Sequence, residues 1–105
     1  QDLVKRVPVS DHVYDYAVTL VAKTRAKREL ATPFINDYLE YGAGPRASQY
    51  LIIGAKTNAL IQGKYSPDIE DVQAVAKMVL RHRIVRNYKA ESQGISADQI
   101  IESIF

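Results

Sequence analysis

Residues 41–55, YGAGPRASQYLIIGA, join a glycine-rich turn to a strongly apolar helix. Pro45 suits the first position of that helix and Gly63 stands just past its end, which predicts a helix over residues 45–62. Its middle, residues 51–55, is apolar nearly all round. A helix of this kind is usually central, with neighbours on several sides. The sequence therefore predicts a helical domain built around this segment.

Two more helices are expected on either side of it. Residues 10–25 carry apolar side chains at helical spacing behind Ser10, a residue type that caps helix N-termini. Residues 67–82 follow Ser66 as a cap, with Pro67 at the first position and acidic residues in the favourable field of the N-terminus. The buried face of the first of these helices is expected to comprise Val13, Ala17, Leu20, Val21 and Thr24.

The last helix is expected over residues 96–105, where Ser96 and Gln99 have the spacing of a capping box. Residues 27–44 form a connector in which Thr32-Pro33 is expected to break any helix. A short extended piece or a single helical turn would both fit in its second half. The expected fold is a single all-α domain over residues 1–105, a small bundle of about four helices.

Composition sets limits on function. The chain has 105 residues, 47% of them hydrophobic, and a formal net charge of only +2. Its longest apolar run is far shorter than the roughly 20 residues that span a bilayer, so no membrane span is expected. The absence of cysteine suits a reducing compartment, and we expect a cytoplasmic protein. Because the chain opens on Gln1 and enters helical sequence almost at once, we expect it to be a piece of a longer protein.

Several kinds of catalytic site find no support in the sequence. His12 and His82 are the only histidines, without the spacing of a metal site, so no metal ligand is predicted. No serine stands in a nucleophile-elbow motif, and an independent enzyme is not expected. Residues 54–57, GAKT, resemble the end of a phosphate loop, but Ala55 occupies the required glycine position and the segment lies within a predicted helix.

Two basic clusters are compatible with nucleic-acid binding. Cations at helix C-termini are also ordinary capping chemistry, which is the simpler interpretation. Tyr88 could stack on a base, but twelve acidic residues are interleaved through the chain and no whole face is basic. Nucleic-acid binding is therefore disfavoured. The first cluster comprises Lys23, Arg25, Lys27 and Arg28, and the second Arg81, Arg83, Arg86 and Lys89.

Arg46 is the most informative single residue. It is predicted to lie in the first turn of the helix over residues 45–62, where the helix dipole repels cations. One interpretation is a surface salt bridge to Asp37 or Glu40, worth about 0–1 kcal/mol. The other is an anion site, because a helix N-terminus and a guanidinium both attract phosphate. Composition and spacing leave both open.

The order of the motifs resembles the C-terminal lid domain of MoxR-type AAA+ ATPases over about residues 10–105. The GxxPRA turn and the LRHRI stretch together are fairly specific, whereas either alone would be weak. One departure is Gly44, where that family commonly has serine, a better helix cap. The matching motifs are YGAGPRA at 41–47, YSPDIEDV at 65–72, VLRHRI at 79–84 and GISAD at 94–98.

The resemblance implies a division of labour in a longer protein. A separate α/β core domain, upstream of Gln1, would hold ATP and Mg²⁺ through its Walker sequences. The lid would pack over the nucleotide, with Gly44 and Pro45 at the helix N-terminus. Arg46 would then be the sensor-2 arginine, which reaches the ATP phosphates. The full-length protein would hydrolyse ATP, whereas this fragment alone would have no catalytic residue.

The resemblance also implies partners. The lid would contact its own core domain and a neighbouring subunit of a homo-hexamer, and Arg81, His82 and Arg83 are candidates for these contacts. Nucleotide-driven motion would serve chaperone-like remodelling or assembly of protein complexes, in some cases beside a protein with a von Willebrand factor A domain. The alternatives are a helical protein-interaction module without a nucleotide role and, less favoured, a helical domain that binds nucleic acid.

Overall fold

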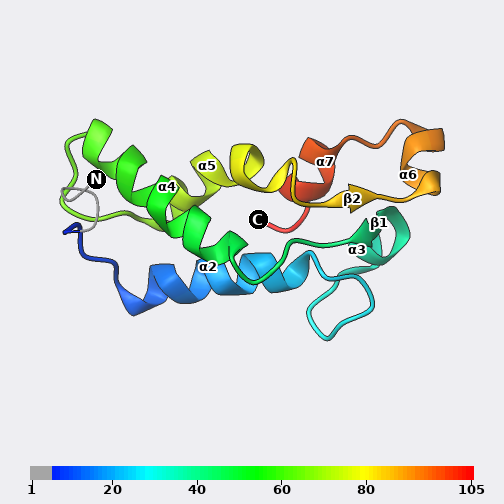
Figure 1. The fold of residues 1–105 in the computed structure, drawn as a ribbon, viewed down its shortest axis with the longest axis horizontal. Coiled ribbons are helices and arrows are strands. Elements are labelled where there is room, and N and C mark those ends of the chain that lie inside the picture. The colour runs from blue at the N-terminus through cyan, green and yellow to red at the C-terminus, as the bar shows by residue number, and fades with distance from the viewer. Residues whose placement is uncertain (1–5) are drawn as a thin grey trace.

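The computed structural model describes residues 6–105, and within this range the chain forms six helices and one two-stranded sheet (Figure 1). The all-α class is confirmed, with six helices in this range where about four were expected. The helices are α2 (Asp11–Lys23), α3 (Pro33–Tyr38), α4 (Ala47–Ile61), α5 (Ile69–Leu80), α6 (Tyr88–Gln93) and α7 (Ala97–Glu102), and the strands are β1 (Leu39–Tyr41) and β2 (Val85–Arg86).

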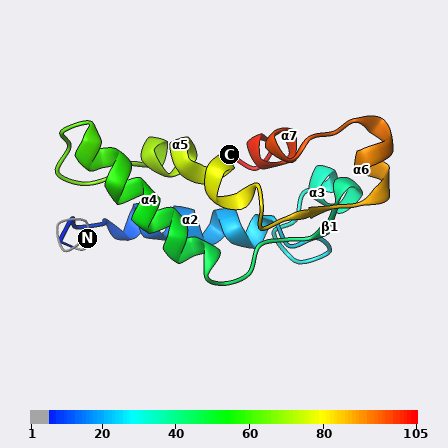
Figure 2. The same cartoon turned by 45° about the horizontal axis from the view of Figure 1, so that its top comes forward.

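Helix α4 lies against both α2 and α5 (Figures 1 and 2). Its contact with α5 is the most extensive between any two elements in the described part. Gly54 permits this approach, because a Cβ atom there would lie 3.0 Å from Cγ2 of Val75. Leu51 and Ala55 are fully buried, whereas Ile53 stays 53% exposed. The α4 helix thus has neighbours on two sides and an open third side.

Helix α2 forms as predicted. The Ser10 hydroxyl accepts a hydrogen bond from the Val13 N–H at 3.3 Å, and the expected face is buried down to Thr24. Near its end, the Lys23 ammonium donates to the Ile104 carbonyl at 3.4 Å. This contact brings the C-terminal segment of the chain beside α2.

Helices α4 and α5 begin two residues later than predicted. Pro45 stands in a tight turn in which the Ala47 N–H donates to the Gly44 carbonyl at 3.1 Å, so the helix proper starts at Ala47. For α5, the cap is Asp68 rather than Ser66, because the Asp71 carboxylate accepts the Asp68 N–H at 2.7 Å. The predicted positions of Pro45 and of the Ser66-Pro67 pair were therefore wrong.

The connector contains a helix that was not predicted. Thr32-Pro33 begins α3 instead of breaking a helix, because the Thr32 hydroxyl accepts the Ile35 N–H at 3.2 Å. Proline is well placed at this first helical position, where its missing N–H would have no partner within the helix. Strand β1 follows directly, so the helical turn and the extended piece are both present.

The segment between α5 and α7 was also missed. Strand β2 pairs antiparallel with β1, and Asn87 then caps α6 by accepting the Ala90 N–H at 2.9 Å. The capping box at the start of α7 is confirmed, with the Ser96 hydroxyl and the Gln99 amide each accepting the other's N–H. Helix α7 ends at Glu102, earlier than expected, although Ile104 remains buried.

Candidate functional site

The turn between β1 and α4 displays Arg46. Ala43 and Ala47 are buried on either side of three exposed residues, Gly44, Pro45 and Arg46. Arg46 is the N-terminal cap residue of α4 rather than a member of its first turn, and its carbonyl accepts the N–H groups of Gln49 and Tyr50. Its side chain makes no capping hydrogen bond. Arg46 is thus an exposed cation beside the positive end of a helix.

The salt bridge considered for Arg46 does not form. Within residues 6–105, neither Asp37 nor Glu40 lies within ion-pair distance of its guanidinium, and no other carboxylate does. The electrostatic conflict between Arg46 and the dipole of α4 is thus not relieved by any carboxylate in this part of the chain.

The turn is anchored to the end of α2 by a contact that the sequence did not reveal. Thr24 is only 1% exposed, and its hydroxyl donates to the Val21 carbonyl at 2.7 Å while accepting the Ala43 N–H at 2.9 Å. The Arg25 Nε donates to the Ala43 carbonyl at 3.4 Å. The backbone N–H and the carbonyl of Ala43 are therefore both hydrogen-bonded to residues at the C-terminal end of α2.

Gly42 permits this anchoring. A Cβ atom at Gly42 would lie 2.2 Å from the Thr24 carbonyl oxygen, which is closer than real Cβ contacts come. Gly44 is different, since a Cβ there would meet nothing within 4 Å. A serine would fit at residue 44, but it would stand two residues before the helix cap. The expectation that serine would cap α4 from this position was therefore wrong.

The three residues after α5 are directed to different neighbours. Arg81 forms a two-pronged ion pair with Asp98 at 2.9 and 3.0 Å, which ties α5 to α7 and, through these hydrogen bonds, lowers the pKa of the Asp98 carboxyl. The Arg83 guanidinium lies 4.4 Å from the centre of the Tyr50 ring and donates to the Val79 carbonyl. His82 is exposed. The structure does not bring these three residues together into one site.

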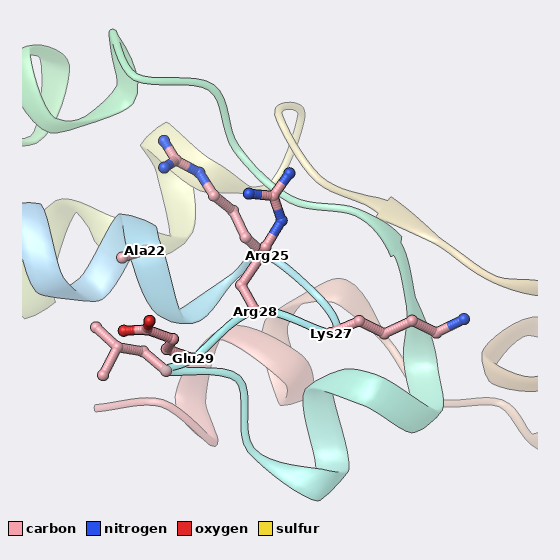
Figure 3. A pocket seen from close by; sticks show the side chains of 6 residues that line it. Ala22, Arg25, Lys27, Arg28 and Glu29 are labelled. Atoms are coloured by element: carbon pink, nitrogen blue, oxygen red, sulfur yellow. The ribbon is translucent and has the colours of Figure 1, made fainter.

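The side chains of the first basic cluster do not form a single basic surface. Figure 3 shows Arg25 and Arg28 extending to the same side, toward the segment between β1 and α4, while Lys27 points elsewhere. Lys27 itself has a left-handed backbone, with φ of 64°. These residues line an open pocket of about 420 Å³ with Ala22, Glu29 and Leu30.

The second basic cluster is similarly divided. Arg86 donates to the Ile95 carbonyl at 2.8 Å, and the Lys89 ammonium lies 5.5 Å from the centre of the Tyr38 ring. Arg86 and Lys89, like Arg81 and Arg83, therefore have their contact partners within the domain.

A shallow apolar groove runs between α4 and α5 on the open side of the domain. It has a volume of about 490 Å³, and its walls include Ile53, Gly54, Val75 and Met78. Ile53 and Met78 are 53% and 67% exposed.

Two other classes of feature are absent from residues 6–105. No three or more His, Cys, Asp or Glu side chains gather there in a way that could hold a metal ion. None of the helices in this range has the length and apolar character that crossing a membrane requires.

Comparison with known proteins gives consistent matches. Chaperone MoxR1 of Mycobacterium tuberculosis (strain ATCC 25618 / H37Rv) is 36% identical over 90 residues, which cover 86% of this chain and 24% of MoxR1. YeaC of Bacillus subtilis (strain 168) is 29% identical over 101 residues, covering 96% of this chain and 29% of YeaC. The crystal structure of a candidate ATPase from Cytophaga hutchinsonii superposes with a TM-score of 0.90 at 37% identity, covering 98% of this chain and 31% of that one.

The chain spans less than a third of the length of each of these relatives. Residues 31–104, from the segment before α3 to the end of α7, match the family model of the AAA lid domain. The chain therefore belongs to the AAA lid domain family and is a C-terminal lid of the MoxR type of AAA+ ATPase.

Proposed function

We propose that Arg46 is a sensor-2 arginine, which contacts the phosphates of ATP held by a separate α/β domain of the full-length protein. The observation that carries this proposal is the placement of Arg46. It is exposed at the N-terminus of α4, on a turn whose two ends are buried, with no carboxylate within ion-pair distance in residues 6–105. An arginine that opposes its own helix dipole becomes favourable once an anion binds.

Phosphate suits this position for a chemical reason. The guanidinium offers a planar fork of N–H donors that matches two phosphate oxygens. The exposed Gly44 and Pro45 leave the approach to the helix end open. Mg²⁺ and most of the binding energy would come from the core domain. The lid would then interact differently with ATP and with ADP, and its angle relative to the core domain would change when ATP is hydrolysed.

The wider role follows from this motion. In our proposal the full-length protein is a cytoplasmic ATPase that assembles as a homo-hexamer, in which each lid passes the nucleotide state to a neighbouring subunit. Its work would be chaperone-like remodelling of protein complexes, beside a partner with a von Willebrand factor A domain. The name of MoxR1 as a chaperone is consistent with this role. Because Arg81 and Arg83 are engaged within the lid, His82 is the freest of the three to contact the core or a neighbour.

Substitution of Arg46 tests the proposal directly. We expect Arg46→Ala in the full-length protein to lower steady-state ATP turnover by about ten-fold or more, since a loss of about 1.4 kcal/mol of transition-state stabilisation has that effect. Arg6→Ala is the matched control, because Arg6 is also exposed but precedes α2, whereas the turn lies at the other end of that helix. Size-exclusion chromatography would show that assembly survives. Unchanged turnover in Arg46→Ala would instead favour a protein-interaction module without a nucleotide role.

The isolated lid should bind ATP too weakly to measure. One charge-assisted hydrogen bond contributes about 1.5–3 kcal/mol and the helix end about 0.3–1 kcal/mol. Their sum barely reaches the ~4.1 kcal/mol of a millimolar complex. Titration calorimetry of the 105-residue chain with ATP should therefore show no binding isotherm. A micromolar complex would contradict the proposed division of labour between lid and core.

A further inference from the structure

We infer that Thr24 is a positioning residue for Arg46: with Gly42, it fastens the arginine-bearing turn to the end of α2 and so sets where the guanidinium meets the nucleotide. This inference rests on the proposed role of Arg46. Thr24 would not touch the nucleotide itself, and it acts only through the backbone of the turn.

The turn that carries Arg46 is anchored at two buried residues. Ala43 and Ala47 are 2% and 1% exposed, and the three residues between them are exposed. Ala47 is held by α4, of which it is the first residue. Ala43 lies outside any helix or strand, and its N–H and carbonyl are bonded to Thr24 and Arg25. The position of the upstream anchor therefore depends on the end of α2.

The segment between the upstream anchor and Arg46 is short. Arg46 lies three positions after Ala43, a span of at most about 11 Å. With both anchors held, the turn has few ways to redirect the Arg46 side chain. If the upstream anchor were released, Gly42 and Gly44 would give the segment wide backbone freedom. A misplacement of about 1 Å can lower a catalytic rate by about 100-fold, so even partial release should be measurable.

The side chain of residue 24 both donates and accepts a hydrogen bond. A hydroxyl can donate and accept at once, and Thr24 uses both capacities, toward the Val21 carbonyl and from the Ala43 N–H. Valine has a similar shape but no hydroxyl, so it would leave the Ala43 N–H unpaired in a buried place. Serine would keep both bonds. The close approach at Gly42 shows that the two backbones are already in contact.

Thr24 and Arg25 precede residues 31–104, the part of the chain that matches the AAA lid domain family. The anchor therefore joins α2, which lies before the matched region, to the turn inside it. Through this contact, any shift of Arg46 toward a phosphate would pull on the end of α2.

The test uses the full-length protein and measures kcat and KM for ATP. Thr24→Val should lower kcat/KM by roughly five-fold, whereas Thr24→Ser should stay within about two-fold of the unmodified protein. Because Thr24 acts through Arg46, Thr24→Val should change kcat/KM by less than about two-fold when Arg46→Ala is already present. Ile101→Val, a substitution in the buried face of α7, serves as a control for loss of stability alone. It should leave kcat/KM unchanged.

Each contrary outcome has a distinct meaning. If Arg46→Ala lowers kcat/KM but Thr24→Val does not, the positioning role is refuted while the proposed function stands. If Arg46→Ala has no effect, the proposed function fails and the positioning role fails with it. Full additivity of the two substitutions, or an equal loss in Ile101→Val, would also overturn the inference. Should Thr24→Val not accumulate as a folded protein, Arg25→Met removes the other bond to Ala43 at a half-buried position and is expected to give the same coupling.

Discussion

Gly42→Ala is expected to lower the melting temperature of the 105-residue chain by roughly 10–20 °C. The added methyl group would lie 2.2 Å from the Thr24 carbonyl oxygen and 2.5 Å from its carbon, both backbone atoms that cannot turn aside. The turn must then move away from α2. Overpacking of this kind costs about 1–3 kcal/mol, and loss of the buried bond between Thr24 and Ala43 adds to it.

Thermal unfolding followed by circular dichroism would measure this effect. Gly44→Ala is the matched control two residues away, where a Cβ has open space and the backbone φ is not positive. It should leave the melting temperature unchanged or raise it slightly, since alanine restricts the unfolded chain. Equal effects of the two substitutions would show that the close approach at Gly42 does not constrain the fold.

Asp71→Ala is expected to destabilise the folded chain by about 3 kcal/mol. Asp71 is 1% exposed, and its carboxylate accepts hydrogen bonds from the Asn58 amide and the Asp68 N–H, each at 2.7 Å. The Lys64 ammonium lies at the same distance. Alanine would leave these donors without their acceptor at the junction of α4 and α5. Urea unfolding would give the difference in free energy, and a change well below about 1 kcal/mol would contradict the importance of this cluster.

The same carboxylate gives the domain a defined response to acid. Burial by itself raises the pKa of Asp71, but the hydrogen bonds from Lys64, the Asp68 N–H and Asn58 outweigh it and hold the pKa below the ordinary value of 3.8. The stabilisation is therefore fully present above about pH 4 and is lost as pH falls below that value. The unmodified chain should lose stability steeply there, and Asp71→Ala less steeply. Asp98→Ala, at an exposed ion pair, should keep most of the acid dependence.

Local signals in the sequence were enough to predict several elements. Helix α2 follows from Ser10 and from apolar side chains at helical spacing, and α7 follows from its capping box. Both depend on residues three or four apart, which interact in any helix. The central place of α4 also follows from its apolar composition. What composition does not specify is its open side, because Ile53 is as apolar as its buried neighbours.

The elements and contacts that were missed depend on residues far apart in the chain. Strands β1 and β2 are too short to show a pattern, and each is stabilised by pairing with the other. Thr24 was expected only as one more buried residue, whereas its hydroxyl meets Ala43, 19 residues away. Asp71 is one of the acidic residues after Pro67 that were expected to be favoured by the helix dipole, but its side-chain partners are Asn58 of α4 and Lys64 in the turn after it. The role proposed for Arg46 was suggested by the sequence, but only the structure shows that no carboxylate of residues 6–105 lies within ion-pair distance of it.

The close packing of α4 on α5 at Gly54 and Val75 has a mechanical consequence. Fifteen residues of unbroken helix make α4 a stiff rod about 22 Å long, with Arg46 at one end and Ile61 at the other. A tilt of roughly 5° about the Arg46 end would carry the far end through roughly 2 Å. Because α5 is pressed against this rod, the groove that contains Ile53 and Met78 would swing with it. Helix α4 would thus act as a lever arm, because a small rotation about its Arg46 end gives a larger displacement at its Ile61 end.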